Sequence, residues 1–182
     1  WDAIRQDNYD VDYQNYYTFL GVLPQRELFV STANALLKAG DKERALKVLD
    51  RCQESMPENV WPLDAIPLGF STNDYMVVNM VSAYFAAGAP DKAAELGAKL
   101  GKELLASAHF YMEYYEYAQD EFEKSCQFLY FLVDELEKGG DKKVSAELKR
   151  SLVTLLRAGA EAYDQDYGNE ADSTVAEDTS AK

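Results

Sequence analysis

Residues 29–57, FVSTANALLKAGDKERALKVLDRCQESMP, have the pattern of two helices joined by a tight turn. Apolar side chains recur at three- and four-residue spacing in both halves, which predicts helices over residues 26–39 and 42–55. Gly40 is suited to end the first helix, because glycine adopts the left-handed backbone conformation without a Cβ clash, and Asp41 is suited to cap the second. The stretch therefore predicts an antiparallel helical hairpin.

The order of small and large residues in this hairpin resembles a tetratricopeptide repeat (TPR). Five positions match that repeat. They are the loop glycine at Gly40, the small alanine at Ala45, a large apolar residue at Leu49, a small apolar residue at Cys52 and the closing proline at Pro57. TPR hairpins cannot bury their apolar faces alone, so they stack and present a concave surface to a partner. The resemblance implies such a stack, and a generic pair of packed helices is the alternative.

Two weaker copies of the pattern follow. Tyr84, Gly88 and Ala93 repeat the tyrosine, glycine and alanine. A third pair, residues 121–138 and 142–162, is separated by Gly139 and Gly140. We predict an all-α domain with a TPR-like stack of about three antiparallel hairpins and inserted loops. The expected segments are a lead-in at 1–25, hairpin one at 26–57, a linker loop at 58–73, hairpin two at 74–108, a tyrosine-rich helix with the third pair at 109–163, and an acidic, disordered tail at 164–182.

The composition limits the possible partners. The net charge is −14, from 32 acidic and 18 basic residues, and such a field repels phosphate backbones, so we expect no nucleic-acid partner. No stretch approaches the roughly 18 apolar residues of a membrane helix, so we expect no direct membrane insertion. Two cysteines, Cys52 and Cys126, are expected to be reduced packing residues. In the linker, Trp61 and Ile66 are expected to cover the bundle.

The sequence predicts no catalytic, metal or cofactor site. The single histidine, His109, has no second histidine or cysteine pair at ligand spacing. Glu113 and Glu116, three residues apart beside Tyr114, would form a glycosidase-like pair if they lay on one helix face. Carboxylates that close and solvent-facing would lack the raised pKa that an acid catalyst needs. The tyrosines of this segment, Tyr111 to Tyr117, are expected to be half-buried packing residues or a ligand-contacting patch.

A protein or peptide is the partner that the pattern favours. Asn34 and Asn79 stand at repeat positions where TPR proteins that clamp a terminal carboxylate carry asparagines, but the accompanying lysines and arginine are missing. A peptide would therefore be bound through amide and aromatic contacts. The candidate partner-binding residues are Asn34, Asn79, Tyr75, Tyr111, Tyr114 and Tyr115.

A broader resemblance rests on three segments: RELFVSTANALLKAGDKERALKVLDRCQESMP, VVNMVSAYFAAGAPDKA and ELLASAHFYMEYY. Their order is similar to the soluble C-terminal region of bacterial multi-spanning membrane proteins related to protein O-mannosyltransferases of the glycosyltransferase C type. Because the chain opens at Trp1, we expect a fragment of such a parent. The resemblance implies a soluble domain of an inner-membrane protein, on the periplasmic side, with any sugar transfer carried out by the membrane portion. It carries no catalytic residue onto this chain.

The function expected from the sequence is a non-catalytic protein-interaction domain, accessory to a membrane glycosyltransferase-like protein. Its partner would be a protein or peptide, including the membrane portion of its own parent chain. The alternative is a carbohydrate-binding or processing module that uses residues 111–117.

Overall fold

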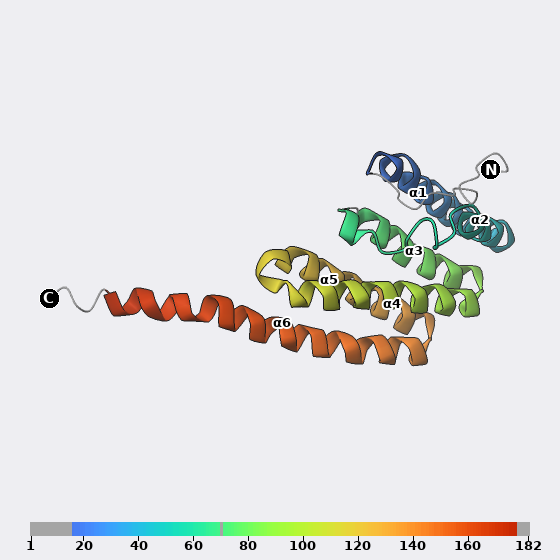
Figure 1. Ribbon diagram of the computed structural model, residues 1–182. Coiled ribbons are helices and arrows are strands. Elements are labelled where there is room, and N and C mark those ends of the chain that lie inside the picture. Colours follow the sequence, from blue (N-terminus) through green and yellow to red (C-terminus); the bar gives the residue numbers. More distant parts are fainter. Residues whose placement is uncertain (1–15, 70, 178–182) are drawn as a thin grey trace.

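The computed structural model describes residues 16–69 and 71–177, and all regular structure in that part of the chain is helical (Figure 1). The elements are α1 (Tyr16–Lys38), α2 (Lys42–Ser55), the 3-10 turn η1 (Ile66–Leu68), α3 (Ser71–Ala87), α4 (Pro90–Glu113), α5 (Tyr115–Gly139) and α6 (Lys142–Glu177). The all-α class is therefore confirmed for these residues. No helix among them is long and apolar enough to cross a bilayer.

Three of the turns are built by glycine. Gly40, Gly88 and Gly140 have φ of 80°, 86° and 89°, in the left-handed region that favours glycine. At each, the N–H of the next residue donates to a carbonyl five residues back, as from Asp41 to Leu36 at 2.9 Å, which satisfies the end of the preceding helix. These are the turns that the sequence predicts.

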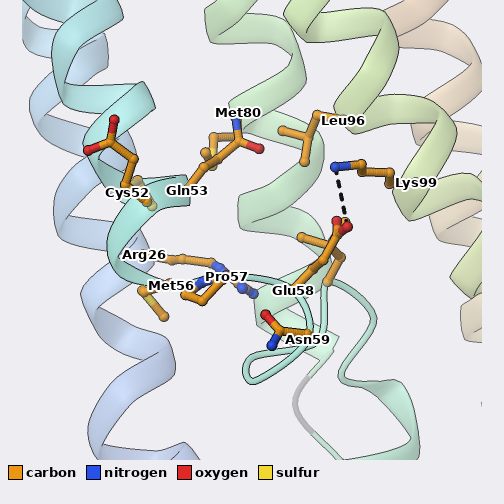
Figure 2. A pocket seen from close by; sticks show the side chains of 12 residues that line it. Arg26, Cys52, Gln53, Met56, Pro57, Glu58, Asn59, Met80, Leu96 and Lys99 are labelled. Carbon is orange, nitrogen blue, oxygen red and sulfur yellow. Dashed lines mark ion pairs between the residues drawn. The ribbon is translucent and has the colours of Figure 1, made fainter. Parts of the chain in front are cut away.

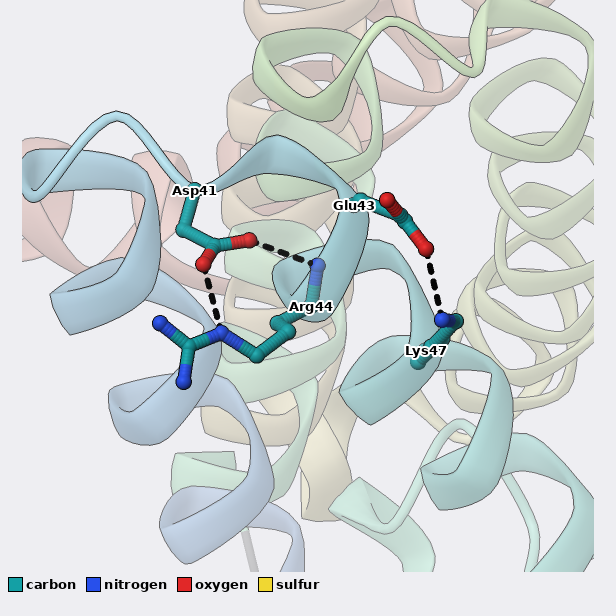
Figure 3. Close-up of polar contacts among 4 residues, drawn as sticks. All are labelled: Asp41, Glu43, Arg44 and Lys47. Atoms are coloured by element: carbon teal, nitrogen blue, oxygen red, sulfur yellow. Dashed lines mark hydrogen bonds and ion pairs between the residues drawn. The ribbon is translucent and has the colours of Figure 1, made fainter.

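The expected aspartate cap of α2 is present. Asp41 accepts a hydrogen bond from the Arg44 backbone N–H at 2.9 Å and another from Arg44 Nε at 2.5 Å (Figure 3). These bonds lower the pKa of the Asp41 carboxyl. One turn further, Lys47 pairs with Glu43 at 2.6 Å on the exposed side of the helix. The cap fixes where α2 starts, and the exposed pair adds little to stability.

The helices pack around one elongated core. The helices of each pair, α1 with α2, α3 with α4 and α5 with α6, contact each other, and α4 packs extensively on α5 across their short junction. In addition α1 packs on α3, and α3 on α5. Every helix contributes to the core, with Phe29, Leu49, Val77, Leu100, Leu132 and Leu152 as examples. Ala33, Ala45 and Ala93 are fully buried, as expected of positions where two helices cross closely.

Trp61 and Ile66 are buried in the segment between α2 and α3, so the prediction that this linker covers the bundle is confirmed. Both cysteines are buried and free. Burial raises the pKa of Cys52 to about 12 and that of Cys126 to about 11, so neither is a reactive thiolate at neutral pH.

The chain ends differ from the expectation. The lead-in is helical from Tyr16 onward, because α1 continues through Pro24, and residues 1–15 lie outside the described part. The acidic segment expected to be disordered continues α6 as far as Glu177, and Figure 1 shows this end of α6 extending past the other helices. A helix already nucleated by packing extends at little cost through residues that would not nucleate one alone. Residues 178–182 are outside the described part.

The inner boundaries also differ. The linker ends earlier than expected, since α3 begins at Ser71. The tyrosine-rich segment is not one helix, because Tyr114 (φ −120°, ψ 33°) separates α4 from α5. A second departure from helical geometry follows at Ala118 (φ −133°, ψ 29°). Tyrosine carries no local signal for such a break, so the expected single helix is wrong here.

Gly101 is predicted to be required for the approach of α4 and α6. A Cβ built at Gly101 would lie 2.6 Å from both methyl carbons of the buried Leu148. Gly101→Ala should therefore lower the free energy of unfolding by about 1–3 kcal/mol, as overpacked cores do. The exposed helical Gly21, with nothing within 4 Å of its Cβ position, is the matched control.

The Gly21→Ala variant should raise the free energy of unfolding by about 0.5–1 kcal/mol, because alanine is the better helix former. Urea denaturation followed by circular dichroism measures both. Equal stabilisation by the two substitutions would show that the α4–α6 contact does not need a glycine.

Candidate functional site

The residues expected on the concave face lie on α1 and α3, which pack against each other. Asn34 is partly exposed on α1, and Asn79 is partly exposed on α3. Tyr75 is 49% exposed and lies one turn before Asn79, on the same face of the helix. Neither asparagine side chain forms a hydrogen bond with a described residue. The two amides and the tyrosine ring are therefore available to a ligand.

The predicted tyrosines divide into two groups. Tyr111 and Tyr115 are each only 8% exposed, whereas Tyr114 is 51% exposed. Two further rings are exposed, Phe110 at 56% and Tyr117 at 83%. Tyr117 belongs to the segment that the sequence offers as an alternative carbohydrate site, whereas Phe110 lies outside that segment. The side chains of Tyr111 and Tyr115 belong to the core, so they are not free to contact a partner.

Glu113 and Glu116 do not lie on one helix face, because Glu113 ends α4 and Glu116 falls in the first turn of α5. The helical spacing assumed for a glycosidase-like pair is therefore wrong. Both side chains are exposed.

A cleft of about 420 Å³ lies between the end of α2, the segment that follows it, α3 and α4 (Figure 2). Its floor is apolar and buried, made by Cys52, Met56, Leu63, Met80 and Leu96. Its rim is polar and includes Gln53, Glu54, Glu58, Asn59 and Lys99. At the mouth, Lys99 from α4 forms an ion pair of 3.2 Å with Glu58 from the segment after α2. An apolar floor with a polar rim is the composition typical of a ligand-binding cleft.

Arg26 forms part of the wall of this cleft and is only 2% exposed. Its Nη1 donates to the carbonyl of Pro62 and to Asn73 Oδ1, both at 2.9 Å, and its Nη2 donates to the carbonyl of Trp61 at 2.7 Å. Burial lowers the pKa of Arg26, and the nearby charge of Glu103 partly offsets this effect. The guanidinium remains charged and ties α1 to the segment beyond α2 and to α3.

Carboxyl groups hold the same segment from its other side. Glu103 on α4 accepts from the backbone N–H groups of Leu63 at 2.9 Å and Asp64 at 2.8 Å. Asp64 accepts from the backbone N–H of Ile66 at 2.9 Å and is hydrogen-bonded to the Ser107 hydroxyl. Burial is the main cause that raises the pKa of Glu103. These acids satisfy a backbone that has little regular secondary structure of its own.

Asp74 is fully buried, and one of its carboxyl oxygens has no hydrogen-bond donor among the described residues. Its other oxygen accepts from the Ala65 N–H at 3.1 Å. Burial, with the nearby Asp64 carboxylate as a second cause, raises the pKa of Asp74 to about 8. Asp74 is therefore protonated at neutral pH, and the oxygen that carries the proton needs no donor.

The groups that line the cleft can hold a ligand through apolar contacts and hydrogen bonds. Within residues 16–69 and 71–177, no three His, Cys, Asp or Glu side chains come close enough to hold a metal ion. The oxygens of Asp64 and Glu103 that bond the backbone are occupied in holding the segment. The polar groups that remain for a ligand are those of the rim, such as Gln53 and Asn59.

Sequence reasoning did not find this cleft. Its walls come from residues far apart in the chain, such as Arg26 and Lys99, and no local motif marks them. The proline and apolar residues after α2 predict a loop that covers the bundle, but they do not indicate that this loop forms one wall of a cleft.

No family model, no curated protein and no solved structure matches this chain.

Arg26→Lys is predicted to destabilise the protein, because an ammonium cannot reproduce the geometry that reaches the Trp61 and Pro62 carbonyls together. Loss of one charged hydrogen bond lowers the free energy of unfolding by about 1.5–3 kcal/mol. Arg157→Lys, at an exposed arginine of α6, is the control and should be neutral. Urea denaturation measures the difference, and equal stability of the two variants would contradict a central role for Arg26.

Asp74→Asn is predicted to remove a pH dependence of stability. Between its unfolded pKa of 3.8 and its folded pKa of about 8, Asp74 keeps its proton only when folded. Stability therefore falls as pH rises through this range, by up to about 1.4 kcal/mol per pH unit. Asparagine is neutral, like the protonated acid, and retains an acceptor for the Ala65 N–H.

The Asp74→Asn variant should match the wild type near pH 4 and exceed it near pH 8 in thermal denaturation. Asp120→Asn, at an exposed carboxylate of α5, is the control and should leave the pH profile unchanged. If Asp74→Asn and the wild type have parallel profiles, Asp74 is not protonated in the folded protein.

Proposed function

We propose that this chain is a non-catalytic protein-interaction domain with a TPR-like stack of helical pairs. Two observations support the stack. The first helices of successive pairs contact one another in order, α1 with α3 and α3 with α5, and each pair turns at a left-handed glycine. A stack of this kind presents side chains of its first helices, here Asn34, Tyr75 and Asn79, on one surface.

The observation that carries the proposal is the cleft. A volume of about 420 Å³ accepts one or two large side chains of a bound segment. Met56 and Met80 in its floor adapt to irregular apolar shapes, and full burial of one aliphatic side chain contributes about 1.5–3 kcal/mol. The buried contacts of Arg26 and Glu103 hold the walls before a ligand arrives, so little free energy is lost in ordering them.

The resemblance to the C-terminal region of bacterial membrane proteins related to protein O-mannosyltransferases supports a location on the periplasmic side of the inner membrane. In this proposal the chain is an accessory domain on the periplasmic side, and its partner is a polypeptide, including the membrane portion of its own parent. Sugar transfer belongs to that membrane portion.

Blocking the cleft should abolish binding of a peptide partner. Peptides selected from a displayed random library against the wild-type chain should lose most of their affinity for Asn59→Trp, because the indole fills the mouth of the cleft from an exposed position. Lys143→Trp, at an exposed position of α6, is the matched control and should bind normally. Peptides that bind all three chains equally would contradict the proposal.

A carbohydrate-binding or processing module at residues 111–117 is the second candidate. One observation favours it, namely the exposure of Tyr114 and Tyr117, since sugar rings stack on exposed aromatic faces. Its test is a titration with a neutral oligosaccharide followed by tyrosine fluorescence. Tyr117→Ser is the informative variant, because Tyr115 is buried and its loss would disturb the core.

A further inference from the structure

The junction of α4 and α5 displays three aromatic side chains to solvent. Phe110, Tyr114 and Tyr117, which we call the aromatic turn, are 56%, 51% and 83% exposed. The rings of Phe110 and Tyr114 are 5.1 Å apart between centroids, so the two form one continuous surface. Large exposed rings that gather at one place mark an interaction site more often than single ones do.

The backbone of the junction produces this exposure. Tyr114 leaves the helical conformation, and the turn is closed by hydrogen bonds from the Tyr114 N–H to the Tyr111 carbonyl at 3.2 Å and from the Tyr117 N–H to the Tyr114 carbonyl at 2.9 Å. Tyr111 and Tyr115 occupy buried positions, and Tyr115 packs edge-on against Phe122 at 5.5 Å. Two buried tyrosines therefore anchor the turn and the exposed rings project from it.

The sequence on either side of the aromatic turn is rich in acidic residues, up to Lys124. Between Lys102 and Lys124 the sequence has no lysine or arginine. The carboxylates nearest the turn are Glu113, Glu116, Asp120, Glu121 and Glu123. None of them forms an ion pair with a described residue. Like charges so close in the chain repel one another, and a cationic ligand relieves that repulsion whereas a neutral sugar does not.

The acids are spread out and not gathered at a point. No three acidic, histidine or cysteine side chains of the described residues are arranged to hold a metal ion. The fitting cation is therefore an extended chain that carries several charges. Arginine and lysine side chains meet both features, since they pair with carboxylates and are attracted to the faces of aromatic rings.

We propose that the aromatic turn binds a basic peptide segment of a partner protein. Arginine or lysine side chains of that segment lie over Tyr114 and Tyr117 and pair with Glu113 and Glu116. This surface is separate from the cleft, whose lining includes none of these residues. The two can therefore be tested independently.

The test measures binding of a fluorescein-labelled peptide of alternating arginine and glycine to the full chain by fluorescence anisotropy. Tyr114→Ser and Tyr117→Ser should each weaken binding by about two- to fivefold, the effect of one cation–aromatic contact at an exposed site. The double variant Glu113→Gln with Glu116→Gln should weaken binding and reduce its dependence on salt. All four side chains are exposed, and circular dichroism checks that each variant is folded.

Three control variants separate binding at the aromatic turn from binding elsewhere on the chain. Tyr130→Ser replaces another exposed tyrosine of α5, at 60% exposure, and Glu147→Gln replaces an exposed carboxylate of α6, and both should bind as the wild type does. If Glu147→Gln weakens binding as much as the Glu113 and Glu116 double variant, the peptide is held only by diffuse attraction to net charge and the proposal fails. Asn59→Trp should also bind normally.

Other outcomes overturn the proposal equally clearly. Loss of peptide binding in Asn59→Trp but not in Tyr117→Ser would move the basic segment to the cleft, which would leave the proposed function standing and refute this inference. Quenching of tyrosine fluorescence by a neutral oligosaccharide, lost in Tyr117→Ser, together with no binding of the arginine peptide, would assign the aromatic turn to a sugar.

Discussion

The buried guanidinium of Arg26 constrains the part of the structure that forms the cleft. Taking a charge out of water costs several kcal/mol unless its N–H groups find acceptors, and here the acceptors are the carbonyls of Trp61 and Pro62 and the amide oxygen of Asn73. If the segment after α2 moved away, the guanidinium would lose most of these bonds inside the protein. The hydrogen bonds from the Arg26 guanidinium therefore hold the segment against α1 and α3, where it forms a wall of the cleft.

Carboxyl groups hold the same segment from the opposite side. One of these carboxyl groups, Asp74, is protonated, so fewer negative charges are buried together. Glu103 and Asp64 accept hydrogen bonds from backbone N–H groups. Asp74 keeps its proton because burial disfavours its charged form, with repulsion by the Asp64 carboxylate as a second cause. One arginine from α1 and acids from α3 and α4 thus replace the regular hydrogen bonds that this backbone lacks. These contacts hold one wall of the cleft in place, and none of them involves a residue of its rim.

The local features of the fold could be predicted, and the long-range ones could not. Glycine turns such as Gly40 and close-packing alanines such as Ala45 follow from rules that act within a few residues, and the structure agrees with them. The bonds of Arg26 join residues 35 to 47 positions apart, and a single sequence holds no signal for such pairs. Residues 164–177 were not predicted to be helical because their polar composition favours disorder when they are considered alone. In the structure they continue a helix that is already packed, which makes helix extension easy.

The backbone break at Tyr114 changes which tyrosines of this segment are buried and which are exposed. On a continuous helix, Tyr111, Tyr114 and Tyr115 would share one face and be buried or exposed together. Because Tyr114 leaves the helix, Tyr111 and Tyr115 point into the core while Tyr114 points out of it. Of the three candidate tyrosines in this segment, only Tyr114 is exposed enough to contact a partner. The exposed rings lie beside Glu113 and Glu116, which form no ion pair with a described residue, so in our proposal the charge at this surface and not the number of tyrosines selects the ligand.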